Sequence, residues 1–268
     1  MVQVIEIVCD STGNTSLAQK LLVEWVPTLI ALVDVCHHIS NLIKDIVRLA
    51  YFSLPIKVVH GTIKYFHTSH IGIANLAKAR EQLAVGHSLE SIGKIQFSTV
   101  VHSSVSVQRC IPAIQKAILF GRVKFDDFQE YYRSEPTSHR AFNFRFGLEQ
   151  LIKIGSPPAN TLTCLEAVEV MAADAYFFWH AMVGKMVEVL FDPRNEFPEE
   201  VQEDILGIIE HCHDQLFSAD GNLSSMAYLA ATYLNPNNLH SDIFKNEKSN
   251  LVKRLCVRRL EMQQCQRH

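Results

Sequence analysis

Residues 2–35, VQVIEIVCDSTGNTSLAQKLLVEWVPTLIALVDV, decide the fold of this chain. Two runs rich in Val, Ile and Leu, Val2–Cys9 and Thr28–Val35, have the composition of β-strands. Between them, apolar residues recur at helical spacing from Leu17 to Trp25. A strand, a helix and a strand in this order predict a βαβ unit with parallel strands. Both runs are almost continuously apolar, which favours strands covered on both faces.

From His37 onward the sequence favours helices. Apolar residues spaced by three and four predict one helix from Ile39 to Leu49 that ends near Pro55. Thr163-Cys164-Leu165-Glu166 has the form of a capping box, so we expect the longest helix to run from Thr163 to Leu190. The remaining expected elements are helices at Ile71–Leu83, Pro112–Leu119 and Pro198–Leu216, with loops at Arg122–Arg145 and Gly155–Asn160.

The predicted fold class is mostly α with a small α/β part. We expect a partial βαβ unit at residues 1–52, a helical insertion-type domain at 53–240, and a basic C-terminal helix or tail at 241–268. The length of 268 residues is enough for one large or two modest domains.

The composition is that of an ordered, reduced protein. Hydrophobic residues make up 48% and charged residues 20%, which excludes a disordered tail. Seven cysteines without a C-x-x-C pair argue against a disulfide framework and a cysteine-rich zinc module. The start of the chain lacks a cationic signal-peptide region, and no apolar run approaches the ~20 residues that cross a bilayer. We therefore expect a nuclear or otherwise intracellular protein that is neither secreted nor in a membrane.

Asp10 follows the first predicted strand and opens a loop of small, hydroxylated residues. Thr12-Gly13-Asn14-Thr15 looks like the phosphate loop of flavodoxins, which would imply flavin mononucleotide, but that fold needs more strand-helix alternations than this chain offers. Asp10 could also be one ligand of a divalent-metal site for phosphoryl transfer. The simplest alternative is a helix N-cap or a turn residue.

The segment after the second strand, Asp34–Ile46 (DVCHHISNLIKDI), resembles the D/C-x-x-H block of hAT-type (hobo/Activator) transposases. Asp34 and His37 fall on that motif. The stretch Ile5–Ala18 is similar to the family segment that carries the second catalytic aspartate, which corresponds to Asp10.

Two later segments extend the resemblance to roughly residues 2–245. Residues 227–236, AYLAATYLNP, resemble the family's late Ala-Ala-x-x-Leu-Asn/Asp-Pro segment. Residues 95–98 stand where the family has Thr-Arg-aromatic-Ser, with Ile95 and Gln96 in place of Thr and Arg. The match is weak between about 120 and 160.

The resemblance implies a ribonuclease-H-like fold interrupted by a helical insertion, which cuts and joins DNA with two Mg²⁺ ions held by an Asp, Asp, Glu triad. Two cations stabilise the attacking and leaving oxygens only when several carboxylates hold them. Only Asp10 matches a triad position, so we expect a fragment incomplete at both ends. It would lack transposase catalysis, keep Asp10 as a vestigial ligand, and need no cofactor unless a partner completes the Mg²⁺ site.

The net charge of −3 hides two basic segments. Lys44–Lys94 and Ser241–His268 each carry seven Lys/Arg and three acids, a net +4. Such segments suit non-specific contact with the DNA backbone, whereas the alternative is an ordinary solvated face. The expected contacts are Lys57, Lys64, Lys78, Arg80, Lys253, Arg254, Arg258 and Arg259.

Three further sites have structural interpretations. His211 and His213 are two residues apart on a predicted helix and cannot easily chelate one ion, so we expect solvent histidines that flank a buried Cys212. Glu166 fits the capping box rather than the missing catalytic acid. Trp179 fits the core better than a base-stacking platform.

These observations favour a transposase-derived, DNA-associated fragment, with a homo-oligomer or a related transposase chain as a further partner. A domesticated helical module for protein interaction is the alternative, and a flavodoxin-like protein is a third hypothesis.

Overall fold

The computed structural model describes residues 5–9, 13–26, 28–93, 97–120, 123, 127–133, 139–167, 171–217 and 223–236. The chain forms two compact units. Residues 1–42 and 160–268 belong to the first unit, and residues 43–159 belong to the second. These units divide the chain at points different from the expected modules 1–52, 53–240 and 241–268, which stay a prediction.

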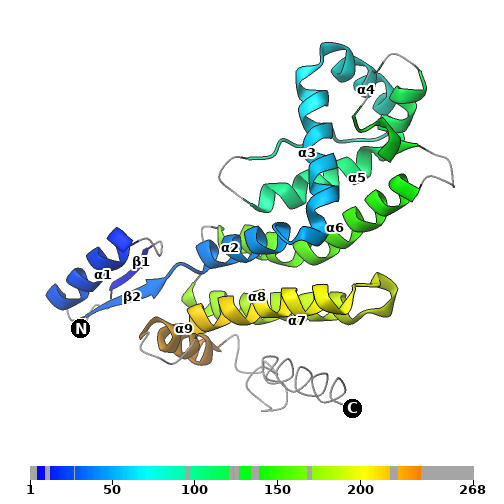
Figure 1. Ribbon diagram of the computed structural model, residues 1–268. Helices are drawn as coiled ribbons and strands as arrows, with labels where there is room; N and C mark the ends of the chain where they lie inside the picture. Colours follow the sequence, from blue (N-terminus) through cyan, green and yellow to red (C-terminus); the bar gives the residue numbers. More distant parts are fainter. Residues whose placement is uncertain are drawn as a thin grey trace, which may run out of the picture. The chain divides into compact units, whose positions relative to one another are not determined.

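The first unit contains the βαβ element that the sequence predicts. Strands β1 (Ile5–Cys9) and β2 (Leu29–Val33) are parallel, with Ile7 opposite Ala31 and Cys9 opposite Val33. Helix α1 (Gly13–Trp25) connects them (Figure 1). Strand β2 is partly buried, with Leu32 only 2% exposed, whereas Val8 of β1 is 54% exposed.

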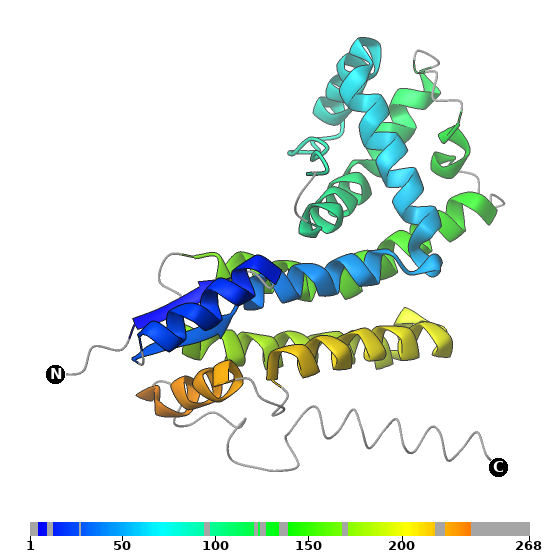
Figure 2. The same cartoon turned by 60° about the vertical axis from the view of Figure 1, so that its left-hand side comes forward.

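Three helices from the second half of the chain pack beside this element. Helices α7 (Ala172–Phe191) and α8 (Glu199–Phe217) run side by side, and α9 (Leu223–Leu234) lies against β2 and α7 (Figures 1 and 2). Trp179 on α7 is completely buried, as the sequence predicts. Cys212 on α8 is buried too, and its Sγ lies 3.4 Å from the carbonyl oxygen of His38. His38 belongs to α2 (Val35–Val47), which follows β2 directly.

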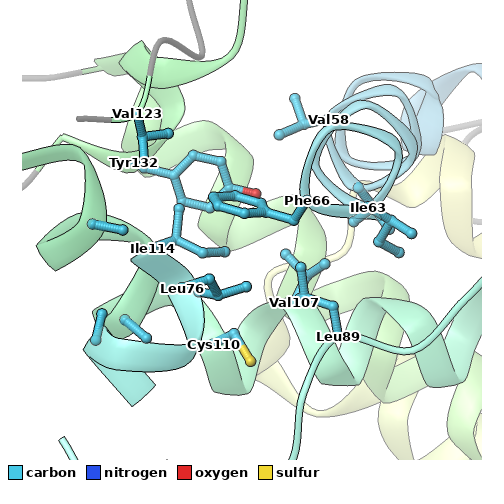
Figure 3. Packing of buried hydrophobic residues seen from close by; sticks show 14 of the residues in the cluster. Val58, Ile63, Phe66, Leu76, Leu89, Val107, Cys110, Ile114, Val123 and Tyr132 are labelled. Carbon is cyan, nitrogen blue, oxygen red and sulfur yellow. The ribbon is translucent and has the colours of Figure 1, made fainter. Parts of the chain in front are cut away.

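The second unit is built from helices around one apolar core. Helices α3 (Ser53–Thr68), α4 (His70–Gln82) and α5 (Ser98–Leu119) pack against one another, and α6 (His139–Leu165) begins in this unit. Phe66, Ile114 and Tyr132 meet at the centre (Figure 3). The Tyr132 hydroxyl lies 2.6 Å from Thr62 Oγ1, which donates to the Val58 carbonyl at 2.7 Å. Tyr132 therefore donates this bond.

The two expected loops at 122–145 and 155–160 are wrong where α6 covers them, because it is helical from His139 to Leu165. Pro157 and Pro158 remove two backbone N–H donors from this helix. The Ser156 hydroxyl donates a hydrogen bond to the nearby Ile152 carbonyl at 2.6 Å. Residues buried at helical spacing along α6 outweigh the two prolines; they are Leu148, Leu151, Ile154, Ala159 and Leu162.

Three other helix boundaries differ from the prediction. Pro55 does not end a helix but lies in the first turn of α3, where its missing N–H costs nothing. Pro112 lies inside α5, which begins at Ser98. Thr163 lies in the last turn of α6, so the expected capping box is absent, and Glu166 is an exposed residue beyond that helix.

The long apolar helix α7 starts nine residues after the predicted start at Thr163, at Ala172. The Asp174 carboxylate caps it by accepting from the Met171 backbone N–H at 2.9 Å.

The architecture is mostly helical with one small parallel sheet, in agreement with the predicted class. Within the ranges described above, no helix is long and apolar enough to cross a membrane.

Candidate nucleic-acid interface

Helix α3 carries a basic face opposite to its buried face. Val59, Ile63 and Phe66 point into the core of the second unit. On the other side, Lys57, His60, Lys64 and His67 are exposed at successive steps of three and four residues. This spacing aligns the four side chains along one surface of the helix. We call them the α3 basic face.

The two lysines of the α3 basic face, Lys57 and Lys64, carry formal positive charges. Partial burial lowers the pKa of His60, because burial disfavours the protonated ring. His60 therefore stays neutral at pH 7 and supplies a ring N–H donor. Two ammonium groups and two imidazoles on one exposed helix surface can bind phosphate oxygens along a nucleic-acid backbone.

The other two cations predicted for DNA contact in this unit lie on α4. Lys78 is exposed. Arg80 is half-buried, and its Nη2 donates to the Gly86 carbonyl at 2.7 Å. This bond ties the end of α4 to the segment that follows it. Arg109 on α5 ties the same segment, because its Nη2 donates to the Ser88 carbonyl at 3.1 Å and contacts Glu90 Oε1 at 3.3 Å.

Asp34 and His37 lie in the first unit. One Asp34 carboxylate oxygen accepts the backbone N–H of His37 at 3.2 Å. This is the N-cap arrangement, and it places the carboxylate at the positive end of the α2 dipole. Asp34 therefore has a structural role at the start of α2. Asp10, Lys253, Arg254, Arg258 and Arg259 lie outside the described residues.

Cys36 stands inside the D-x-x-H block. Burial, with smaller contributions from the negative charges of Asp34 and Glu166, raises its pKa to about 11. The thiol is therefore protonated at neutral pH, and a thiolate is the form that attacks substrates or binds metal. Nucleophilic chemistry at Cys36 is disfavoured.

The structure brings together two of the segments that resemble the hAT-type family. Tyr228, in the segment 227–236, donates its hydroxyl to the Val33 carbonyl at 2.6 Å, and Val33 immediately precedes Asp34. Thr232 of the same segment is buried and donates to the Ala173 carbonyl at 2.9 Å. Cys9 pairs with Val33 across the sheet, so the residues that precede Asp10 and Asp34 are neighbours.

The histidines of α8 differ from the prediction in one respect. His211 is exposed, as expected. His213 is half-buried and packs against Phe217 and His180, with ring centroids 5.5 and 6.2 Å away. The sequence places His213 beside Cys212, but only the packing of α8 on α7 shows that its ring turns inward. No group of three or more His, Cys, Asp or Glu in the described ranges could hold a metal ion.

His60 and His67 were missed at the sequence level. The recurrence of Lys57, His60, Lys64 and His67 at helical spacing is the signal that could have found them. It was obscured because Pro55 indicated a break at the point where α3 begins. Comparison with protein-family models, curated proteins and solved structures finds no match to this chain.

Proposed function

We propose that this chain is a DNA-associated protein derived from an hAT-type transposase, and that it binds the DNA backbone without cutting it. The observation that carries the proposal is the hydrogen bond from Tyr228, in the segment 227–236, to Val33, which immediately precedes the Asp34 block. The two segments are 195 residues apart at this bond, and each resembles the same family. Their contact is what a common fold would require.

The α3 basic face supports the DNA contact. Lysines on an exposed helix bind phosphates through charge, so the affinity falls as salt rises. Of the carboxylates that the resemblance implies, this sequence carries a match to Asp10 only, and one carboxylate does not hold two metal ions. The proposed activity is therefore binding rather than cleavage.

The test is titration of a fluorescent duplex with the full chain, followed by anisotropy. We expect affinity to fall between 50 and 200 mM salt. Lys57→Gln with Lys64→Gln should reduce the slope of log affinity against log salt by about 2, because roughly one counterion is released per phosphate contact. Lys153→Gln with Lys185→Gln is the matched control, since these lysines pair with Glu149 and Glu188.

Two results would contradict the proposed binding to the DNA backbone. Either affinity is independent of salt, or both double variants weaken binding equally. A Mg²⁺-dependent cleavage activity that Asp10→Ala abolishes would contradict the absence of catalysis.

A protein-interaction module is the second candidate function. Helix α1 favours it, because its outward surface is apolar and exposed: Trp25 is 84% and Leu17 59% exposed. Binding of another protein with no affinity for DNA would support this function in place of the first.

A further inference from the structure

Helix α1 turns its polar side toward the sheet. Gln19 is half-buried, and its Nε2 donates to the Ile7 carbonyl at 3.1 Å and to the Leu32 carbonyl at 3.0 Å. One side-chain amide thus joins the helix to both strands. Thr15 and Val23, which share this side of the helix, are also half-buried. Hydrogen bonds from Gln19 therefore contribute to the attachment of the helix to the sheet.

The outward side of α1 is apolar. It consists of two adjacent rows at i, i+4 spacing, which we call the α1 ridges: Leu17, Leu21 and Trp25 form one, and Ala18, Leu22 and Val26 form the other. All six residues are exposed. Val26 continues the helical pattern, because its N–H donates to the Leu22 carbonyl at 2.9 Å. Amphipathic helices normally bury such a stripe, and a contiguous exposed one marks an interface.

We infer that a second copy of this chain covers the α1 ridges through its own α1, with the two helices antiparallel about a two-fold axis between Leu21 and Leu22. This inference does not rest on the proposed function. Rows at i, i+4 spacing interdigitate when two helices pack ridge into groove. About this axis Leu21 meets Leu22 of the second copy, Trp25 meets Ala18, and Leu17 meets Val26. The largest side chain thus faces the smallest, and every ridge residue has an apolar counterpart.

The charges beside the ridges match the same arrangement. Lys20 and Glu24 are exposed one turn apart on the flank next to Leu17 and Leu21. In an antiparallel pair this flank faces the same flank of the second copy, so Lys20 lies within one residue of Glu24 across the axis. A parallel two-fold pair would instead turn this flank toward the opposite flank of the second copy, so Lys20 and Glu24 would not meet across the axis. The pattern is therefore complementary to itself, as a two-fold interface requires.

One pair of short helices makes a small interface, below about 1,200 Å², which is typical of weak association. The first experiment is therefore sedimentation equilibrium of the full chain over a wide concentration range. We expect the mass to rise from 30.4 kDa towards twice that value. Trp25 gives a second signal, because the other tryptophan, Trp179, is already buried. Emission should shift to shorter wavelength, and quenching by acrylamide should fall, as concentration rises.

Leu21→Lys should weaken dimerisation at least tenfold without unfolding the monomer, since Leu21 is 50% exposed. The matched control is Leu119→Lys at an 80% exposed leucine of the second unit, which should leave dimerisation unchanged. At low salt, Lys20→Glu should weaken the dimer about threefold, the scale of an exposed ion pair. Adding Glu24→Lys should restore it, because the opposite charges face each other again.

Several outcomes would overturn the inference. A monomer at all concentrations with Trp25 open to acrylamide would point to a different partner. A monomer with Trp25 shielded would mean that the chain covers its own ridges. A dimer that survives Leu21→Lys would place the interface elsewhere.

Discussion

Among single residues, His180 couples the stability of the first unit to pH. Its ring packs against Tyr176, with centroids 4.3 Å apart, and lies beside His213 and Phe217. Burial, with a smaller contribution from the charge of His213, lowers the pKa of His180 to about 4. Burial also lowers the pKa of His213, although Asp214 at 3.6 Å acts in the opposite direction. Both rings are therefore neutral in the folded protein at pH 7.

The sign of the effect follows from proton binding. In the unfolded chain His180 takes up a proton near pH 6.5, whereas the folded protein resists protonation until about pH 4. The free energy of unfolding therefore keeps its full value above pH 6.5 and falls as the pH drops towards 4. From His180 alone we expect a loss of about 2 kcal/mol between pH 7 and pH 5.

His180→Phe should remove most of this loss, because phenylalanine keeps the ring contacts and does not titrate. Urea unfolding of the variant and the parent at pH 7 and pH 5 measures the difference. His211→Gln is the control, since His211 is exposed on α8 close to His213 and should leave the pH dependence as in the parent. An equally large loss in His180→Phe would mean that other groups cause the acid sensitivity.

At the scale of elements, what the sequence predicts well is local. Val, Ile and Leu runs predicted β1 and β2, and the 3.6-residue period predicted a helix at Pro198–Leu216, close to the observed bounds of α8. The predicted ends of helices were wrong where proline or glycine indicated a break but burial against distant segments kept the chain helical. Gly155 was expected in a loop, yet a Cβ there would lie 2.8 Å from Val101 Cγ2, so this glycine allows two helices to approach closely.

In the candidate interface too, local features can be predicted from the sequence, whereas contacts between distant segments cannot. Exposure of Lys57 and Lys64 follows from helical spacing once α3 is known to exist. Other features depend on segments that come together only in the folded chain. They are the hydrogen bond from Arg80 to the Gly86 carbonyl and the inward orientation of the His213 ring. Residue type alone does not distinguish an arginine that binds a carbonyl from one that faces solvent.

Two helical glycines give a paired prediction about element packing. A Cβ on Gly61 of α3 would lie 2.2 Å from Phe128 Cε2, and Phe128 packs against the core and Tyr131. Gly61→Ala should therefore displace this ring and cost roughly 1 to 3 kcal/mol, as overpacking does. A Cβ on Gly207 of α8 meets nothing within 4 Å. Gly207→Ala should stabilise the protein by up to about 1 kcal/mol through helix propensity.

Thermal unfolding of both variants tests this prediction. The two substitutions add the same methyl group to the middle of a helix, so propensity acts equally in both. Equal shifts of Tm would mean that Phe128 moves aside at no cost.

At the scale of the whole molecule, the second compact unit and the N-terminal part of the first unit differ in how much apolar core each has to stabilise it as an isolated fragment. The second unit holds an apolar core that lies entirely within residues 58–148. The N-terminal part of the first unit, residues 1–42, contains two short strands, α1 and the start of α2, and the side of α1 that faces the sheet is partly polar. A two-stranded sheet with little apolar cover is marginal by itself in water.

We therefore expect the fragment 43–159 to fold and the fragment 1–42 to remain unfolded. Circular dichroism should give a helical spectrum and one cooperative thermal transition for 43–159, because its core is intact. The 1–42 fragment should show neither, since Tyr228, which donates to Val33 at 2.6 Å, and the α9 surface against β2 are missing. Fragments are compared at one concentration and again at a tenfold higher one, so that self-association through the α1 ridges is not mistaken for folding. A cooperative transition in 1–42 at the lower concentration would show that the βαβ element needs no cover from α9, and loss of the transition in 43–159 would show that its core depends on the first unit.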